Sequence, residues 1–130
     1  MSRRDPALRD PGVFRRLVAE AIDAVPEEFR RHLENVAVVV AEEPTDQDIL
    51  EAGLDPREDT LYGLYHGVPL PERPHDFAGV PPDRITIYRR PLLRDCRSAD
   101  ELRREIECTV VHEIAHFFGL DDDQIEKLGY

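Results

Sequence analysis

Two histidines and a glutamate stand inside an apolar stretch near the end of the 130-residue sequence. The stretch reads TVVHEIAHFFGLDD, and its chemically active members are His112, Glu113 and His116. A spacing of four residues places both imidazoles on one face of a helix, where two ring nitrogens can reach one cation at about 2.0–2.1 Å. Glu113 is rotated by roughly 100° from His112, so it reaches a water on that cation rather than the cation itself. The HExxH pattern therefore predicts two metal ligands and one general base.

A glycine and an aspartate extend this pattern to HExxHxxGxxD. Gly119 follows His116 by three residues, and Asp122 follows Gly119 by three. The glycine allows a sharp turn, after which Asp122 can return as a third ligand, because zinc accepts carboxylate oxygen at about 2.0–2.2 Å. Asp121 and Asp123 are the alternatives, and this acidic run also favours the start of a short last helix. Mixed nitrogen and oxygen ligation predicts one bound Zn²⁺ ion.

Four other side chains could stabilise an oxyanion, but no motif supports them. They are Tyr65, His66, His75 and Tyr88, and we expect each to serve packing or to face solvent. Cys96 and Cys108 are too far apart for a CxxC motif, so we expect two buried or half-buried thiols.

The elements that must position these residues follow from apolar periodicity and capping residues. Helices are predicted from Phe14 to Val25, over 26–35, from a Thr45 cap through Leu50, from a Ser98 capping box to Phe117, and within 121–130. Strands are predicted over 36–42, over 61–66 as an edge or half-exposed strand, and over 84–90. The proline-rich segment 67–84 is expected to be a long ordered loop. Residues 106–118 are apolar nearly all round, which predicts burial on most sides of that helix.

Composition limits the partners and the compartment. The formal net charge is −11, from 28 acidic and 17 basic residues, which disfavours a nucleic-acid partner. No stretch has the length and apolarity of a signal peptide or a membrane span, so we expect a cytoplasmic protein without membrane association. Residues 1–12 are polar and expected to be flexible, and 13–130 are expected to form a single domain.

Together these segments resemble the small bacterial zincin-like metallopeptidase family. The resemblance covers about Phe14 to Tyr130 and includes LYGLYHGVPLPER, PPDRITIYRRPLL and ELRREIECTVVHEIAHFFGLDDDQIEKLGY. It implies an α+β minimal zincin-like fold, with a short mixed sheet packed against a backing helix and a central active-site helix. It also implies that His112, His116 and Asp122 bind zinc, that Glu113 is the catalytic base, and that the substrate is a peptide or protein. The sequence has no methionine after Met1, so it lacks the Met-turn of metzincins.

Three alternatives to a zinc peptidase remain open. A zincin without turnover could act as a metal-binding or protein-binding module, although a purely structural site would need no base such as Glu113. An endoribonuclease family carries HGxxHxxGxxH at similar spacing, but Glu113 replaces its glycine and the chain is acidic. Peptide deformylases combine HExxH with an upstream cysteine, but Cys96 lies just before the predicted helix cap, sixteen residues ahead of His112, where it cannot face the second half of the helix.

Overall fold

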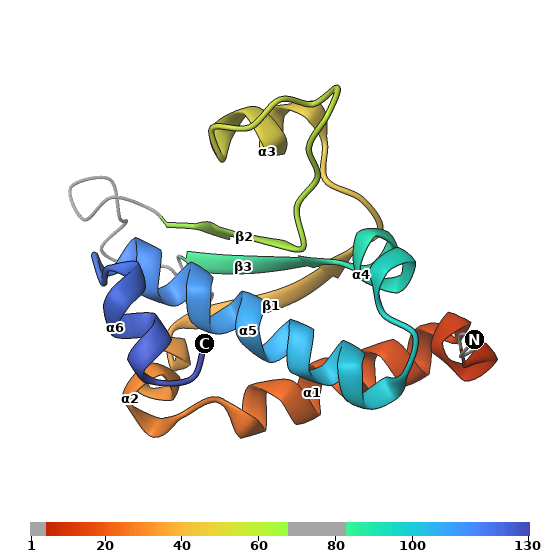
Figure 1. Cartoon of the computed structure of the whole chain (residues 1–130), viewed down its shortest axis with the longest axis horizontal. Helices are drawn as coiled ribbons and strands as arrows, with labels where there is room; N and C mark the ends of the chain where they lie inside the picture. Colours follow the sequence, from red (N-terminus) through yellow and green to blue (C-terminus); the bar gives the residue numbers. More distant parts are fainter. Residues whose placement is uncertain (1–4, 68–82) are drawn as a thin grey trace.

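The fold is that of a computed structural model that describes residues 5–67 and 83–130, except the side chain of Asp122. It has the α+β architecture expected from the sequence, with helices packed around a three-stranded mixed sheet (Figure 1). The predicted proline-rich loop lies outside the described residues, apart from its ends at Gly67 and at Asp83 and Arg84. Within the described residues, no helix is long and apolar enough to cross a membrane.

The described N-terminal residues form two short helical elements. A 3₁₀ turn, η1 (Pro6–Arg9), precedes α1 (Pro11–Ala24), and the Asp10 side chain caps α1 by accepting from the Gly12 amide at 2.8 Å. Leu8 is completely buried in the core. One buried apolar side chain and two local caps thus give residues 5–12 a defined local structure, while the expected flexibility of residues 1–12 stays a prediction.

The sheet has the order β1-β3-β2, so β3 is its central strand. β1 (Val36–Ala41) pairs in parallel with β3 (Asp83–Tyr88), with Val38 opposite Ile85. β2 (Gly63–His66) pairs antiparallel with β3 and lies at an edge, as its alternating pattern predicted. Figure 1 shows α1 and α5 on one side of the sheet and α3 (Asp46–Glu51) on the other.

The bounds of the shorter helices and of the strands agree with the sequence prediction in most places. The predicted second helix is split into α2 (Glu27–Arg30) and the 3₁₀ turn η2 (Arg31–Leu33). Thr45 caps α3 in a capping box with Asp48. The predicted strand over 84–90 is too long at its end, because Arg89 and Arg90 begin α4 (Arg89–Asp95) instead.

Tertiary contacts explain why the chain turns into α4. The Arg89 guanidinium donates to the Glu42 carboxylate at 2.9 Å and to the main-chain oxygen of Arg9 at 2.7 Å. The Arg90 amide donates to the main-chain oxygen of Glu42 at 2.9 Å. Pro91 falls in the first turn of α4, where the missing amide hydrogen needs no helical partner. That proline was the available sequence signal for this helix.

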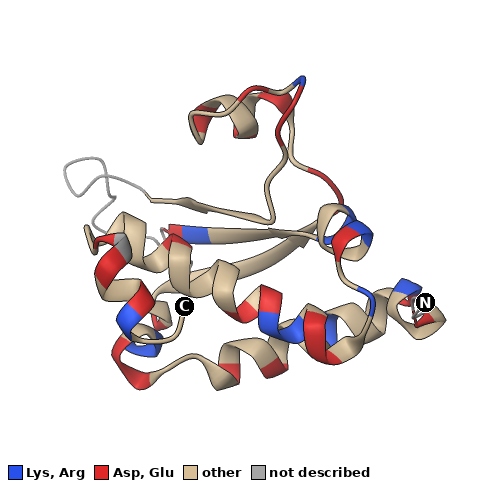
Figure 2. Cartoon of the chain, viewed as in Figure 1, with Lys and Arg blue, Asp and Glu red and all other residues tan. Residues whose placement is uncertain are grey.

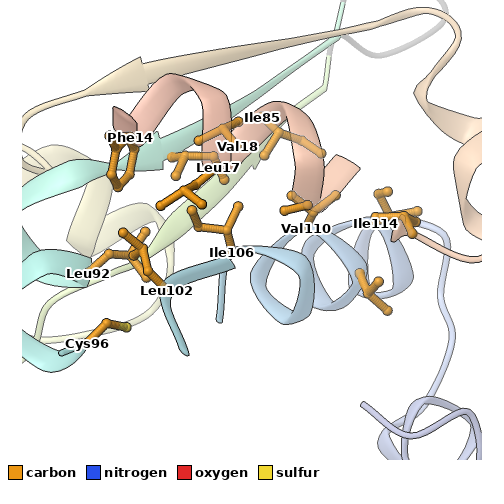
Figure 3. Packing of buried hydrophobic residues seen from close by; sticks show 14 of the residues in the cluster. Phe14, Leu17, Val18, Ile85, Leu92, Cys96, Leu102, Ile106, Val110 and Ile114 are labelled. Carbon is orange, nitrogen blue, oxygen red and sulfur yellow. The ribbon is translucent and has the colours of Figure 1, made fainter. Parts of the chain in front are cut away.

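The long helix α5 (Ala99–Phe117) begins and ends where the sequence predicts. The Ser98 hydroxyl accepts from the Glu101 amide at 3.1 Å, and Gly119 closes the helix at φ 78°. The α5 side chains Leu102, Ile106, Val110 and Ile114 pack against α1, β3 and α4, as Figure 3 shows. Phe117 and Phe118 are 45% and 46% exposed, so the predicted burial on most sides fails at the C-terminal end of the helix.

Candidate metal centre

The second half of α5 carries the three residues of the HExxH pattern. His112 and Glu113 are half-buried, whereas His116 is exposed. The rings of His112 and His116 lie edge to face, with their centroids 5.9 Å apart. Imidazoles on successive turns of one helix are an arrangement in which a nitrogen of each ring can bind one cation at about 2.0–2.1 Å. The structure thus brings the two predicted histidine ligands together.

Glu113 is held by the neighbouring edge strand. The main-chain amide of Tyr65 in β2 donates to Glu113 Oε1 at 3.0 Å. Burial raises the pKa of the Glu113 carboxyl, while the Tyr65 amide and the nearby His116, His112 and His66 act in the opposite direction. A carboxylate with a raised pKa is a stronger base than an exposed glutamate, which suits a group that must take a proton from water.

The region of the third predicted ligand starts the last helix. Gly119 turns the chain, and α6 (Asp122–Lys127) begins three residues later. The Asp121 carboxylate caps this helix by accepting from the Gln124 amide at 2.8 Å, and Asp123 is exposed. The side chain of Asp122 lies outside the described part of the chain. Among the described side chains, no group of three or more possible ligands gathers around one point.

Zinc nevertheless fits the donor types available here. The imidazoles of His112 and His116 are neighbours, and the Glu113 carboxylate lies on the same helix. The acidic first turn of α6 begins six residues after His116. Structural zinc sites usually close with four protein ligands, whereas catalytic sites use three and leave one position open. If Asp122 joins His112 and His116, the donor set is two nitrogens and one oxygen, the pattern of a catalytic site.

A C-terminal anchor on His112 was not anticipated from the sequence. The main-chain oxygen of Tyr130 lies 3.0 Å from His112 Nε2. The Arg104 Cζ atom lies over the Tyr130 ring, 4.6 Å from its centroid. The Tyr130 hydroxyl donates to the Glu107 carboxylate. Arg104 also donates to the main-chain oxygen of Gly129 at 2.6 Å. The only hint in the sequence is an aromatic residue directly after a glycine. In the structure this glycine, Gly129, has a φ of 90°.

The candidate oxyanion residues have other contacts. The Tyr65 hydroxyl donates to Asp83 at 2.7 Å, and its ring stacks on Phe117 with centroids 4.0 Å apart. The Tyr88 hydroxyl donates to Asp48 at 2.9 Å, and His66 lies 3.9 Å from Glu51. These contacts agree with the packing roles expected from the sequence. His75 lies outside the described residues.

Both cysteines are free thiols, as predicted. Cys96 is buried in the hydrophobic core, so it is no candidate for a metal ligand near His112. Cys108 is half-buried and lies one helical turn before His112, where it lines a groove.

This groove has a volume of about 300 Å³ and opens beside His112 and Glu113. One wall is α5, and the other is the chain that leads into β2. The lining residues are Thr60, Leu61, Tyr62, Gly63, Glu105, Cys108, Thr109, His112 and Glu113. The candidate base therefore faces a space that can admit a ligand.

Comparisons with known proteins agree with this description. A conserved hypothetical protein from Thermo thermophilus superposes with a TM-score of 0.53 at 23% sequence identity, over 85% of this chain and 94% of that one. At this identity the likeness supports the fold alone. No match was found among curated proteins. The family model described as zincin-like metallopeptidase matches residues 33–130, which include all the site residues discussed above. The chain therefore belongs to the zincin-like metallopeptidase family.

Proposed function

We propose that the protein is a zinc-dependent peptidase in which Glu113 is the general base. The observation that carries this proposal is the position of Glu113, which follows one of two adjacent imidazoles, accepts a hydrogen bond from β2 and faces a groove. A structural zinc site would not need a basic carboxylate at the mouth of a groove.

His112, His116 and Asp122 would hold the zinc. When bound, zinc supplies a Lewis acid that makes water a nucleophile near neutral pH. Because the Tyr65 amide occupies Glu113 Oε1, the other carboxylate oxygen is available for proton transfer. Glu113 takes a proton from the attacking water and returns it to the amine as the peptide bond breaks. An extended substrate would lie in the groove beside Glu113, along the chain that leads into β2.

The test compares the wild type with Glu113→Gln. Glutamine has the same shape and can still accept from Tyr65, but it cannot take a proton. We expect both proteins to bind equal amounts of zinc by elemental analysis and only the wild type to cleave a peptide library. A loss of at least about 100-fold in kcat is expected, since general-base catalysis contributes 10²–10⁴-fold.

The same pair of proteins separates the other functions. Zinc binding without cleavage of any peptide by the wild type would point to a binding module. Cleavage of structured RNA by the wild type, lost in Glu113→Gln, would replace the peptidase with a ribonuclease. The chain's net charge of −11 argues against that second outcome, because an acidic protein repels phosphate backbones.

A further inference from the structure

The groove beside Glu113 runs along one face of α5. Its α5 residues recur at intervals of three and four, starting at Glu105 and ending at Glu113, which places them in one row. Seven residues separate Glu105 from His112, a rise of about 10 Å along the helix. Glu105 and the metal-binding residues therefore lie at opposite ends of the groove.

The other wall of the groove ends at the edge strand β2. The Tyr88 amide donates to the main-chain oxygen of Tyr62 at 2.8 Å, and Leu64 pairs with Thr86 in the same register. In an antiparallel ladder the main-chain groups alternate in direction, so those of Gly63 and Tyr65 point away from β3. The Tyr65 amide indeed reaches Glu113. Gly63 lines the groove but is buried against Thr109 of α5, so an extended peptide would lie along the groove rather than pair with the strand at this point.

The far end of the groove is negative. Glu105 is half-buried, and within residues 5–67 and 83–130 no arginine, lysine or histidine forms an ion pair with it. Segment 52–60, which leads into the groove, has one basic residue, Arg57, and three acidic ones, Asp55, Glu58 and Asp59. Figure 2 shows acidic positions on α3 and on the chain between α3 and β2. A half-buried carboxylate attracts a cation more strongly than an exposed one, because less water screens its charge.

We propose that Glu105 is a specificity residue that binds a lysine or arginine side chain of an extended peptide. The rise of about 10 Å between Glu105 and His112 corresponds to about three residues of an extended chain, so the basic residue lies about three positions from the cleaved bond. This inference rests on the proposed peptidase function, because it assigns the substrate class of the same site.

The test measures binding rather than turnover. Zinc-loaded Glu113→Gln is titrated with fluorescent peptides that carry lysine, norleucine or glutamate at each position up to four residues on either side of a central bond. Lysine about three residues from the centre should bind on the order of fivefold more tightly than norleucine, and the preference should fall with added salt. Adding Glu105→Gln should abolish this preference.

A matched control removes the effect of net charge. Glu126 is exposed on α6, away from the groove, so Glu126→Gln changes the charge equally and should leave the lysine preference intact. Equal binding of lysine and norleucine peptides, or an equal loss of preference in Glu126→Gln, would overturn the role of Glu105. Binding of no peptide would overturn it as well.

Cleavage of the same peptides by the zinc-loaded wild type tests the proposed function separately. A lysine preference in binding without any cleavage would refute only the peptidase function.

Discussion

Glu113 shows how one carboxylate acquires two roles from its surroundings. Burial raises its pKa, and a main-chain amide from β2 fixes one of its oxygens. The first effect strengthens the base, and the second sets the direction from which it can take a proton. A glutamate on the exposed face of α5 would have neither property.

The three consecutive aspartates after Gly119 should separate into different roles. Asp122→Ala should weaken zinc binding by at least about tenfold, measured by competition with a chromophoric chelator, because it removes the proposed third ligand. Asp121→Ala should retain zinc but lower the free energy of unfolding by about 1 kcal/mol, because it removes the cap of α6. Asp123→Ala should change neither quantity. Unchanged zinc affinity in Asp122→Ala would exclude Asp122 as a ligand.

Tyr130 should contribute a pH-dependent part of the stability. Burial, followed by the hydrogen bond to Glu107, raises the pKa of its hydroxyl from 10.0 to about 12. The neutral hydroxyl is therefore favoured in the folded protein, and its contribution is complete below pH 10 and lost as the pH rises through about 12. Tyr130→Phe should cost about 1 kcal/mol at about pH 8 in urea unfolding, and the difference from wild type should close between about pH 10 and 12. A difference that stays constant across this range would refute the role assigned to the hydroxyl.

At the scale of elements, the close contact between β2 and α5 positions the base. A Cβ atom at Gly63 would lie 2.7 Å from the methyl group of Thr109 and 3.0 Å from the main-chain oxygen of Thr86. Gly63→Ala should therefore push β2 away from α5 and move the Tyr65 amide from Glu113. We expect a loss of about 1–3 kcal/mol in the free energy of unfolding and a lower kcat.

A second substitution tests this explanation. Thr109→Ser removes the clashing methyl group but keeps a hydroxyl that can donate to the main-chain oxygen of Glu105. The double variant should recover part of the stability and activity that Gly63→Ala loses. If the two effects simply add, with no recovery, the contact between these two residues is not the cause.

The local features of these elements could be predicted from the sequence, whereas their contacts could not. Ser98, Thr45 and Gly119 mark helix ends through bonds to residues close in sequence, so their roles are visible in the sequence itself. The approach of His112 and His116 is equally local, because one helical turn sets it. The contact of Tyr65 with Glu113 spans 48 residues and that of Tyr130 with His112 spans 18, and no local pattern encodes either. The start of α4 at Arg89 and the burial of Leu8 also depend on distant partners.

At the scale of the whole molecule, metal binding should stabilise the fold. The proposed ligands lie on α5 and α6, so a bound ion would tie the last helix to the core. Free zinc at about 100 times its dissociation constant should add about 2.7 kcal/mol to the free energy of unfolding, seen as a higher Tm in calorimetry. Chelation should reverse this shift, and the double variant His112→Ala/His116→Ala should show no zinc-dependent shift. A shift that persists in that variant would place the zinc elsewhere.

The central claim is that His112, His116 and Asp122 bind one zinc ion within reach of Glu113. The most direct measurement is a crystal structure of the zinc-loaded protein with anomalous data at the zinc edge. We predict one strong anomalous peak at about 2.0–2.1 Å from a nitrogen of each histidine and about 2.0–2.2 Å from an Asp122 oxygen, with Glu113 near the ion but not bound to it. A peak bound by other residues, or no peak between His112 and His116, would contradict the account.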